Sequence, residues 1–372
     1  MARRGLQQLD WVLVGTTVLI TALGLLVLYS SGIKATAVQG QIDTTRQLLY
    51  AAIGIVAMLI LARFDYRSLK SYAIPLYILM SVSLLAVEVV GTTALGAQRW
   101  ISIGFFQFQP SEFAKIALII ALATYHARYY NQTPRFRHLV ILTLILLPPL
   151  ILVVSQPDLG TGLVCIAIWL TMAIASKVRR LYLFGGLAAI AAVLPLFYRY
   201  LASYQRQRID VLLNPQADRL GIGYNVTQSV IAVGSGGWFG RGLSAGSQSQ
   251  LNFLPSQHTD FIFAVLAEKL GFIGAALLIV LFGILIVRIY IISTLSIDRF
   301  GSFLCIGVAS MFLFHILVNI GMNMGIMPVT GIPLPFVSAG GTSMLMSMVA
   351  VGMVLSVARH RDSKRRLKDE QV

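Results

Sequence analysis

The sequence predicts an all-α polytopic integral membrane protein of about ten transmembrane helices, with both termini in the cytoplasm and one large loop outside. Of its 372 residues, 57% are hydrophobic and only 12% are charged. Soluble domains average about 45–50% apolar and about 25% charged residues, so a soluble fold would leave too much apolar surface in water. A membrane protein buries that surface in lipid, at about 20 apolar residues per span.

Ten apolar runs account for the predicted spans. The first follows MARRGLQQLD and is longer than the core of a secretory signal, and no small-residue cleavage site comes after it, which favours an uncleaved first helix. The sequence shows no internal repeat of the kind that inverted-repeat transporters carry. The runs cover about residues 11–29, 47–62, 71–90, 112–125, 139–155, 160–176, 181–198, 261–287, 300–322 and 341–358.

Basic residues orient these spans. The chain has 29 Lys and Arg against 14 Asp and Glu, a formal charge of +15, which in a soluble protein would point to nucleic acid. Here most Lys and Arg fall on alternate connections and on the last residues, and cytoplasmic loops of membrane proteins carry that excess. The charge therefore predicts that both termini face the cytoplasm and the anionic lipid of the inner leaflet, with no nucleic-acid partner.

We expect one transmembrane domain over residues 1–372, with a large outer loop at about 200–259 and a basic cytoplasmic tail at about 359–372. Loops longer than about 15 residues are usually functional or disordered. The aromatic residues Trp238, Phe239 and Phe253 and the Gly-rich run VGSGGWFGRG favour a folded cap. The five His and two Cys residues have no metal-ligand spacing, so spacing predicts no metal site.

Ionisable residues at the edge of a span are costly and mark functional sites by default. Glu112 and Lys115 share one helix face, either as a structural ion pair or as part of an outward-facing polar cleft. Asp158 is placed to cap a helix. Asp260 lies where the long loop re-enters the membrane, and it either caps a helix or accepts a proton. Because a helix N-terminus favours a carboxylate, we expect Asp260 to be ionised at neutral pH.

Five segments together resemble one family, in order and along essentially the full chain. They are QRWISIGFFQFQPSEFAKI, SQPDLGTGLV, GYNVTQSVIAVGSGGWFGRGL, LNFLPSQHTDFIFAVLAEKLG and MPVTGIPLPFVSAGGTSML, and the family is that of the SEDS (shape, elongation, division and sporulation) proteins. The stretches RQRIDVLLNPQADRLGIGYNVTQS and QSQLNFLP resemble its elongation members more than its division members. The resemblance implies a peptidoglycan glycosyltransferase of the bacterial cytoplasmic (inner) membrane. Such an enzyme polymerises lipid II at the outer face during cell elongation, with a class B penicillin-binding protein as partner.

The resemblance also implies site residues. It maps the essential aspartate onto Asp260, which would act as the general base towards a sugar hydroxyl. The substrate-binding candidates are Arg46, Arg99, Glu112, Lys115 and, less directly, Asp158, together with His258 beside the aspartate. Their basic members would stabilise the departing diphosphate. A divalent cation, Mg or Mn, could share that task, but no cluster of carboxylates in the sequence fixes one.

Two departures from the family pattern and two other functions stay open. Ser256 stands where the family usually has Glu, and Ala339 stands where it usually has Tyr. A lipid II flippase or transporter would place its charges near the bilayer midplane, whereas these lie at outer helix ends, which favours chemistry at the outer surface. A non-catalytic scaffold for a penicillin-binding protein would have the same composition as an active enzyme.

Overall fold

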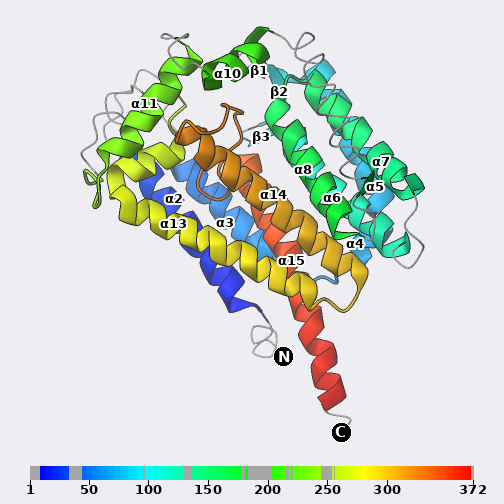
Figure 1. The fold of residues 1–372 in the computed structure, drawn as a ribbon. Coiled ribbons are helices and arrows are strands. Elements are labelled where there is room, and N and C mark those ends of the chain that lie inside the picture. The colour runs from blue at the N-terminus through cyan, green and yellow to red at the C-terminus, as the bar shows by residue number, and fades with distance from the viewer. Residues whose placement is uncertain are drawn as a thin grey trace.

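The computed structural model describes residues 9–32, 44–94, 97–104, 106–129, 136–176, 181–182, 203–213, 218, 221–243, 254 and 256–369. Figure 1 shows a bundle of helices with a small sheet at one end. The helices are α2 (Trp11–Gly32), α3 (Thr44–Leu61), α4 (Ser68–Ser71), α5 (Ala73–Val90), α6 (Pro110–Tyr129), α7 (Phe136–Ser155), α8 (Leu159–Ala175), α10 (Ser203–Leu213), α11 (Ile222–Ser235), α13 (Ile262–Thr294), α14 (Arg299–Asn323) and α15 (Gly341–Asp369). The strands are β1 (Thr92–Ala94), β2 (Ala97–Ile103) and β3 (Phe106–Phe108).

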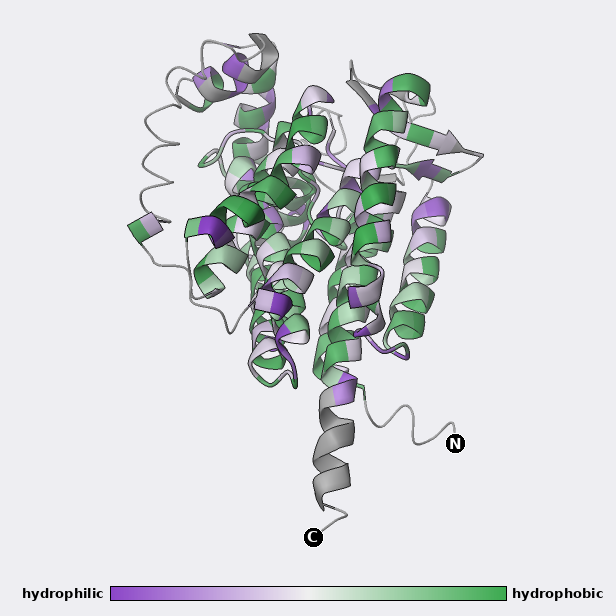
Figure 2. Ribbon diagram, turned by 90° about the vertical axis from the view of Figure 1, so that its right-hand side faces the viewer, coloured by the Kyte–Doolittle hydropathy of each residue, from purple (hydrophilic) through white to green (hydrophobic). Residues whose placement is uncertain are grey.

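The predicted all-α polytopic class is confirmed. Seven helices, α2, α3, α5, α7, α13, α14 and α15, are long and apolar enough to cross a membrane, and α8 is a shorter apolar helix. With α6, these match nine of the ten predicted runs, and the run at 181–198 lies almost wholly outside the described residues. Most residues along the helices are coloured hydrophobic in Figure 2. Many large apolar side chains are exposed on the outside of the bundle, among them Ile74 at 73% and Val89 at 83% on α5, as in a protein surrounded by lipid.

The two ends of the bundle differ. The start of α2 and the end of α15 lie at one end, as the prediction of two cytoplasmic termini requires, and α10, β1 and β2 lie at the other (Figure 1). The described part of the outer loop expected at about 200–259 contains the helices α10 and α11. Val211 and Val226 of these helices pack in one cluster with Phe261 and Val329. The boundaries of the loop and of the basic tail stay predictions.

The sheet between α5 and α6 is a feature that the apolar pattern did not predict. Its strands are antiparallel in the order β1-β2-β3, with Trp100 opposite Thr92 and Ile101 opposite Phe108. The strands β1 and β3 have three residues each, too few for a period-two pattern, and the sequence AQRWISI of β2 does not alternate strictly. The sheet matters because β2 carries Arg99 across the outer end of the bundle.

Polar contacts fix α13 against α2 at two levels. Lys269 is fully buried, and its Nζ donates to Ser30 Oγ at 2.8 Å and to Ser31 Oγ at 2.9 Å. Further along the helix, Arg288 pairs with Asp10 at 2.8 Å. Such interhelical hydrogen bonds and ion pairs matter in a membrane, because the hydrophobic effect that drives helix association in water is absent there. The position of α13, which begins beside Asp260, is therefore set by specific contacts.

A break in α13 at Gly271 changes the direction of the helix. Gly271 has φ 68° and ψ −166°, a region open almost only to glycine. The backbone groups released there pair with the segment 236–242, since Phe272 N–H donates to the carbonyl of Gly237 at 2.8 Å and Arg241 N–H donates to that of Glu268 at 2.9 Å. The break thus turns the outer part of α13 while keeping its backbone hydrogen-bonded.

We predict that Gly271→Ala lowers the stability of the protein in detergent by about 1–3 kcal/mol, because that conformation is strained for any other residue. A Cβ at this position would also lie 2.3 Å from the backbone N of Gly240. The matched control is Gly283→Ala in the same helix, where no atom lies within 4 Å of the added carbon. Thermal unfolding of both variants tests this, and equal melting temperatures would contradict it.

Candidate active site

Asp260 lies in the turn that leads the outer loop into α13. The backbone N–H groups of Thr259 and Asp260 both donate to the carbonyl of Ser256 at 3.1 Å. The N-cap residue of α13 is Phe261, and its side chain provides no cap bond. The half-buried Asp260 carboxylate faces Gly331, where a Cβ would lie 3.7 Å from Oδ2. The carboxylate therefore faces a residue that has no side chain.

The segment 324–340, between α14 and α15, holds this turn from a second side. Ser338 Oγ donates to the carbonyl of Thr259 at 2.6 Å. Ala339 N–H donates to the carbonyl of His258 at 2.9 Å. The aspartate is thus carried by a turn whose backbone is bonded on both sides, which is the kind of support that catalytic groups require.

The helix α14 provides a third support. The side-chain amides of Asn319 and Asn323 donate to the backbone carbonyl of Asp260 at 3.1 Å and 3.0 Å. Both asparagines are fully buried. Buried amides destabilise a protein unless they are hydrogen-bonded, so the hydrogen bonds of these two amides hold the Asp260 turn against α14.

The electrostatic surroundings of Asp260 differ from the sequence-based expectation. Burial raises the pKa of the Asp260 carboxyl above its ordinary value, and the negative charge of Asp158 raises that pKa further. The positive charges of Arg208 and Arg99 and the Thr259 hydroxyl lower the pKa of Asp260, but the net direction is upward. Burial is the largest of these effects and acts against the ionised form that the helix N-terminus was expected to favour, and the ionised state of Asp260 at neutral pH stays a prediction.

Asp158 is the N-cap of α8, as predicted. Its Oδ1 accepts from Thr161 N–H at 3.2 Å, and its Oδ2 accepts from the Thr161 hydroxyl at 2.9 Å and from that of Ser111 at 3.1 Å. Arg99 of β2 lies beside it, with Nε donating to the carbonyl of Gln156 at 3.0 Å and a terminal nitrogen 4.0 Å from Asp158 Oδ1. Asp158 is therefore occupied by structural bonds.

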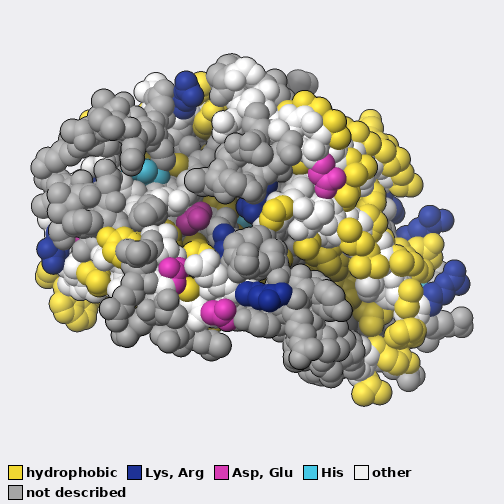
Figure 3. Space-filling view, turned by 90° about the horizontal axis from the view of Figure 1, so that it is seen from above, with side chains coloured by type: hydrophobic (Ala, Val, Ile, Leu, Met, Phe, Trp, Pro, Cys, Tyr) yellow, Lys and Arg dark blue, Asp and Glu magenta, His cyan; other side chains and the backbone are white. Residues whose placement is uncertain are grey.

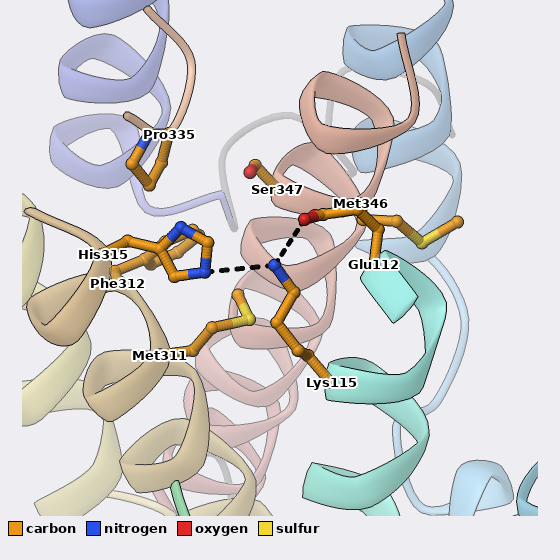
Figure 4. A pocket seen from close by; sticks show the side chains of 8 residues that line it. All are labelled: Glu112, Lys115, Met311, Phe312, His315, Pro335, Met346 and Ser347. Atoms are coloured by element: carbon orange, nitrogen blue, oxygen red, sulfur yellow. Dashed lines mark hydrogen bonds and ion pairs between the residues drawn. The ribbon is translucent and has the colours of Figure 1, made fainter. Parts of the chain in front are cut away.

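Glu112 and Lys115 form a buried ion pair of 2.7 Å. Lys115 Nζ also lies 3.1 Å from His315 Nε2, and His315 Nδ1 lies 3.0 Å from the carbonyl of Pro333. Because a carbonyl only accepts, Nδ1 carries the proton and Nε2 accepts from the lysine. The pair lines a pocket between α6, α14 and α15 (Figure 4). Its remaining lining residues are Met311, Phe312, Pro335, Met346 and Ser347.

The last two candidates lie at the outer ends of other elements. Arg46 is exposed in the first turn of α3, next to Gln47, whose side-chain amide donates to the carbonyl of Ser338 at 3.4 Å. Burial, and then the charge of Lys269, lowers the pKa of His258 to about 4. His258 is therefore neutral at pH 7, and its buried Nδ1 has no hydrogen-bond partner among the described residues.

The structure joins some candidates and separates others. It brings Asp260 close enough to Asp158 and Arg99 for their charges to act on one another. The cause is that the start of α8 packs closely on the segment 324–340, where a Cβ on Gly160 would lie 2.7 Å from the carbonyl oxygen of Thr330. The Glu112–Lys115 pair is connected to the same segment through His315, whose ring lies 3.0 Å from the carbonyl of Pro333, and it shares its pocket with Pro335 of that segment. The roles of all these residues stay predictions.

Four residues of the site were not singled out from the sequence. They are Arg208, His315, Asn319 and Asn323. The two asparagines, four residues apart in an apolar helix, carried a usable signal, since polar residues inside a span are expected to have partners. Arg208 carried none, because it is one of several basic residues in the outer loop.

Seen from the outer end, acidic, basic and histidine side chains come to the surface near the middle of the face (Figure 3). The chain is thus a polytopic membrane protein with charged groups collected around a carboxylate at its outer end. A family model described as cell cycle protein, of the FtsW, RodA and SpoVE type, matches residues 10–363. The chain belongs to the FtsW/RodA/SpoVE family, and it is a multi-pass protein of the bacterial inner membrane.

Curated relatives and solved structures agree with this membership. The peptidoglycan glycosyltransferase MrdB of Escherichia coli (strain K12) is 38% identical over 356 residues, 95% of each chain. Stage V sporulation protein E of Bacillus subtilis (strain 168) is 37% identical over 360 residues, 94% of this chain and 97% of that protein. A chain from a peptidoglycan synthase complex aligns with TM-score 0.80 and 31% identity, over 95% of this chain and 98% of that chain. The Thermus thermophilus rod shape determining protein RodA aligns with TM-score 0.71 and 29% identity, over 95% and 97%.

We predict that Lys115→Met destabilises the protein by about 3–5 kcal/mol, because it leaves the Glu112 carboxylate buried without its cation. The double variant Glu112→Gln/Lys115→Met should recover part of that loss. Denaturant unfolding in detergent measures both. A double variant as unstable as the sum of the two single variants would show that the charges are not coupled.

Proposed function

We propose that this chain polymerises lipid II into glycan strands at the outer face of the inner membrane during cell elongation, with Asp260 as the general base. Its relatives of 33–38% identity include peptidoglycan glycosyltransferases of Escherichia coli and Treponema pallidum, which supports glycosyl transfer as the activity. The observation that carries the proposal is the geometry of Asp260. Its carboxylate lies at the outer end of the bundle, is not the cap of its helix, and feels the charges of Arg208 and Arg99.

In the proposed reaction, the 4-hydroxyl oxygen of one lipid II disaccharide bonds to the anomeric carbon of another. The bond from that carbon to undecaprenyl diphosphate breaks, and the diphosphate leaves with the electron pair. A sugar hydroxyl is a weak nucleophile until its proton is removed, and Asp260 accepts that proton. A positioned base contributes about 10²–10⁴ in rate. The upward pKa shift makes Asp260 a stronger base than an exposed aspartate.

The developing charge on the diphosphate needs cations nearby. Arg46 is exposed, and the side chain of Arg99 is 24% exposed, so both are accessible to a ligand. Lys115 is only 2% exposed and already bonds to Glu112 and His315, which favours a supporting role. We therefore propose that Arg46 and Arg99, rather than Lys115, bind the diphosphate.

A divalent cation remains a prediction. No group of three or more His, Cys, Asp and Glu residues that could hold a metal exists in the part of the chain that the structure describes. A Mg²⁺ or Mn²⁺ ion at this site would have to take most of its oxygen ligands from the substrate diphosphate.

We also propose that the chain works with a class B penicillin-binding protein, which would cross-link the strands. The support is the similarity to a chain from a peptidoglycan synthase complex that coordinates polymerization and crosslinking.

The two departures from the family pattern, Ser256 and Ala339, leave the backbone contacts of the Asp260 turn in place, since both residues make these contacts through main-chain atoms.

We predict that Asp260→Asn lowers polymerisation of labelled lipid II by at least about 10²-fold, because the amide cannot accept the proton. The purified protein is assayed with and without its penicillin-binding protein. Asp210→Asn is the control, since this exposed acid lies on α10 in the same outer loop.

Wild-type polymer with unchanged activity in Asp260→Asn would exclude the proposed base. If the wild type forms no polymer even with the partner, yet moves lipid II between the leaflets of liposomes, the chain is a flippase. If it does neither and still binds the partner, it is a scaffold.

The acidic limb of the kcat–pH profile gives a further prediction. A base must be unprotonated to act, so activity should rise with pH through the raised pKa of Asp260, above the ordinary aspartate value of about 3.9. Arg208→Gln removes a charge that lowers this pKa, so the limb should move to higher pH. Arg206→Gln, on the same helix, should leave the limb in place. An unmoved limb in Arg208→Gln would contradict the electrostatic assignment.

A further inference from the structure

The side-chain amide of Asn323 lies between two backbone groups at the start of α13. Its Nδ2 donates to the carbonyl of Asp260 at 3.0 Å, and its Oδ1 accepts from the N–H of Ala264 at 3.0 Å. In a continuous α-helix a carbonyl accepts from the N–H four residues later, so these two groups would bond to one another. Asn323 has therefore inserted its amide into the place of the first backbone hydrogen bond.

Asn319, one turn earlier on α14, reinforces this insertion. Its Nδ2 donates to the carbonyl of Asp260 at 3.1 Å and to that of Ile332 at 2.8 Å. Asn323 Nδ2 in turn lies 2.8 Å from the carbonyl of Asn319, and the Ser229 hydroxyl of α11 donates to the carbonyl of Asn323 at 2.9 Å. The Asp260 turn is thus connected to the outer loop and to the segment 324–340.

A comparison of the two aspartates shows what the insertion does. Asp158 precedes α8, and its carboxylate caps that helix by accepting from Thr161 N–H. Asp260 lies one residue before Phe261, the N-cap of α13, and an amide from α14 accepts the N–H of Ala264. A carboxylate that caps a helix is turned towards the backbone N–H groups. The carboxylate of Asp260 does not accept the N–H of Ala264, and it faces Gly331.

We propose that Asn323, supported by Asn319, is a positioning residue that satisfies the first turn of α13 and thereby leaves the Asp260 carboxylate available to the acceptor hydroxyl. This inference rests on the proposed function of Asp260 as base. It assigns Asn323 no contact with substrate.

The substitution Asn323→Ala is expected to leave the protein folded. Once the amide is absent, the carbonyl of Asp260 keeps its hydrogen bond from Asn319, and we expect the Asp260 carboxylate to accept the N–H of Ala264. This change satisfies the buried backbone groups and moves the carboxylate. A displacement of about 1 Å can cost about 10²-fold in rate.

The test compares Asn323→Ala and Asn319→Ala with the control Asn225→Ala on α11, in the full-length protein with its partner. We expect kcat for lipid II to fall by about 10²-fold in Asn323→Ala, with KM changed less than about twofold, and less in Asn319→Ala. The acidic limb of kcat should move to lower pH, because a carboxylate that accepts backbone N–H groups is easier to ionise. A purely structural role would reduce the folded fraction without moving the limb.

The outcomes are distinct. A wild-type kcat and pH limb in Asn323→Ala, while Asp260→Asn is inactive, overturns the inference and leaves the proposed function standing. If Asn323→Ala does not fold, Asn319→Ala decides: a lower kcat per folded molecule at unchanged KM supports the inference, and a wild-type kcat overturns it. Full activity in Asp260→Asn overturns the proposed function, and the positioning role with it.

Discussion

Every α-helix leaves its first N–H groups without partners inside the helix, and the site of this protein is built from the groups that satisfy them. A membrane offers no water to do so in its hydrocarbon region. The start of α8 is satisfied by the carboxylate of Asp158, and the start of α13 by the amide of Asn323. The break in α13 is satisfied by the segment 236–242. Which polar group serves each helix end decides which carboxylate makes no cap bond, and this is the carboxylate of Asp260, the proposed base.

The local features of this site could be predicted from the sequence. Asp158 follows a proline and precedes an apolar run, so its capping role is visible in neighbouring residues. The Glu112–Lys115 pair is likewise three residues apart on one helix. The apolar runs gave the class and the spans, because the lipid requires long stretches of one kind of residue.

What could not be predicted depends on which helices meet. Asn323 and His315 belong to the site only because α14 lies against the start of α13 and against α6. The burial of Asp260 could not be predicted for the same reason, since the helix end is visible in the sequence but the elements that surround the carboxylate are not. The strand that carries Arg99 was missed because its sequence AQRWISI does not alternate strictly between apolar and polar residues.

The row of hydrogen bonds from Glu112 through Lys115 to His315 ends on the carbonyl of Pro333. A backbone carbonyl accepts a hydrogen bond but carries no exchangeable proton of its own. The row therefore ends on a group that passes no proton further. If Asp260 is the proposed base, the proton that it takes from a sugar hydroxyl needs a route other than this row.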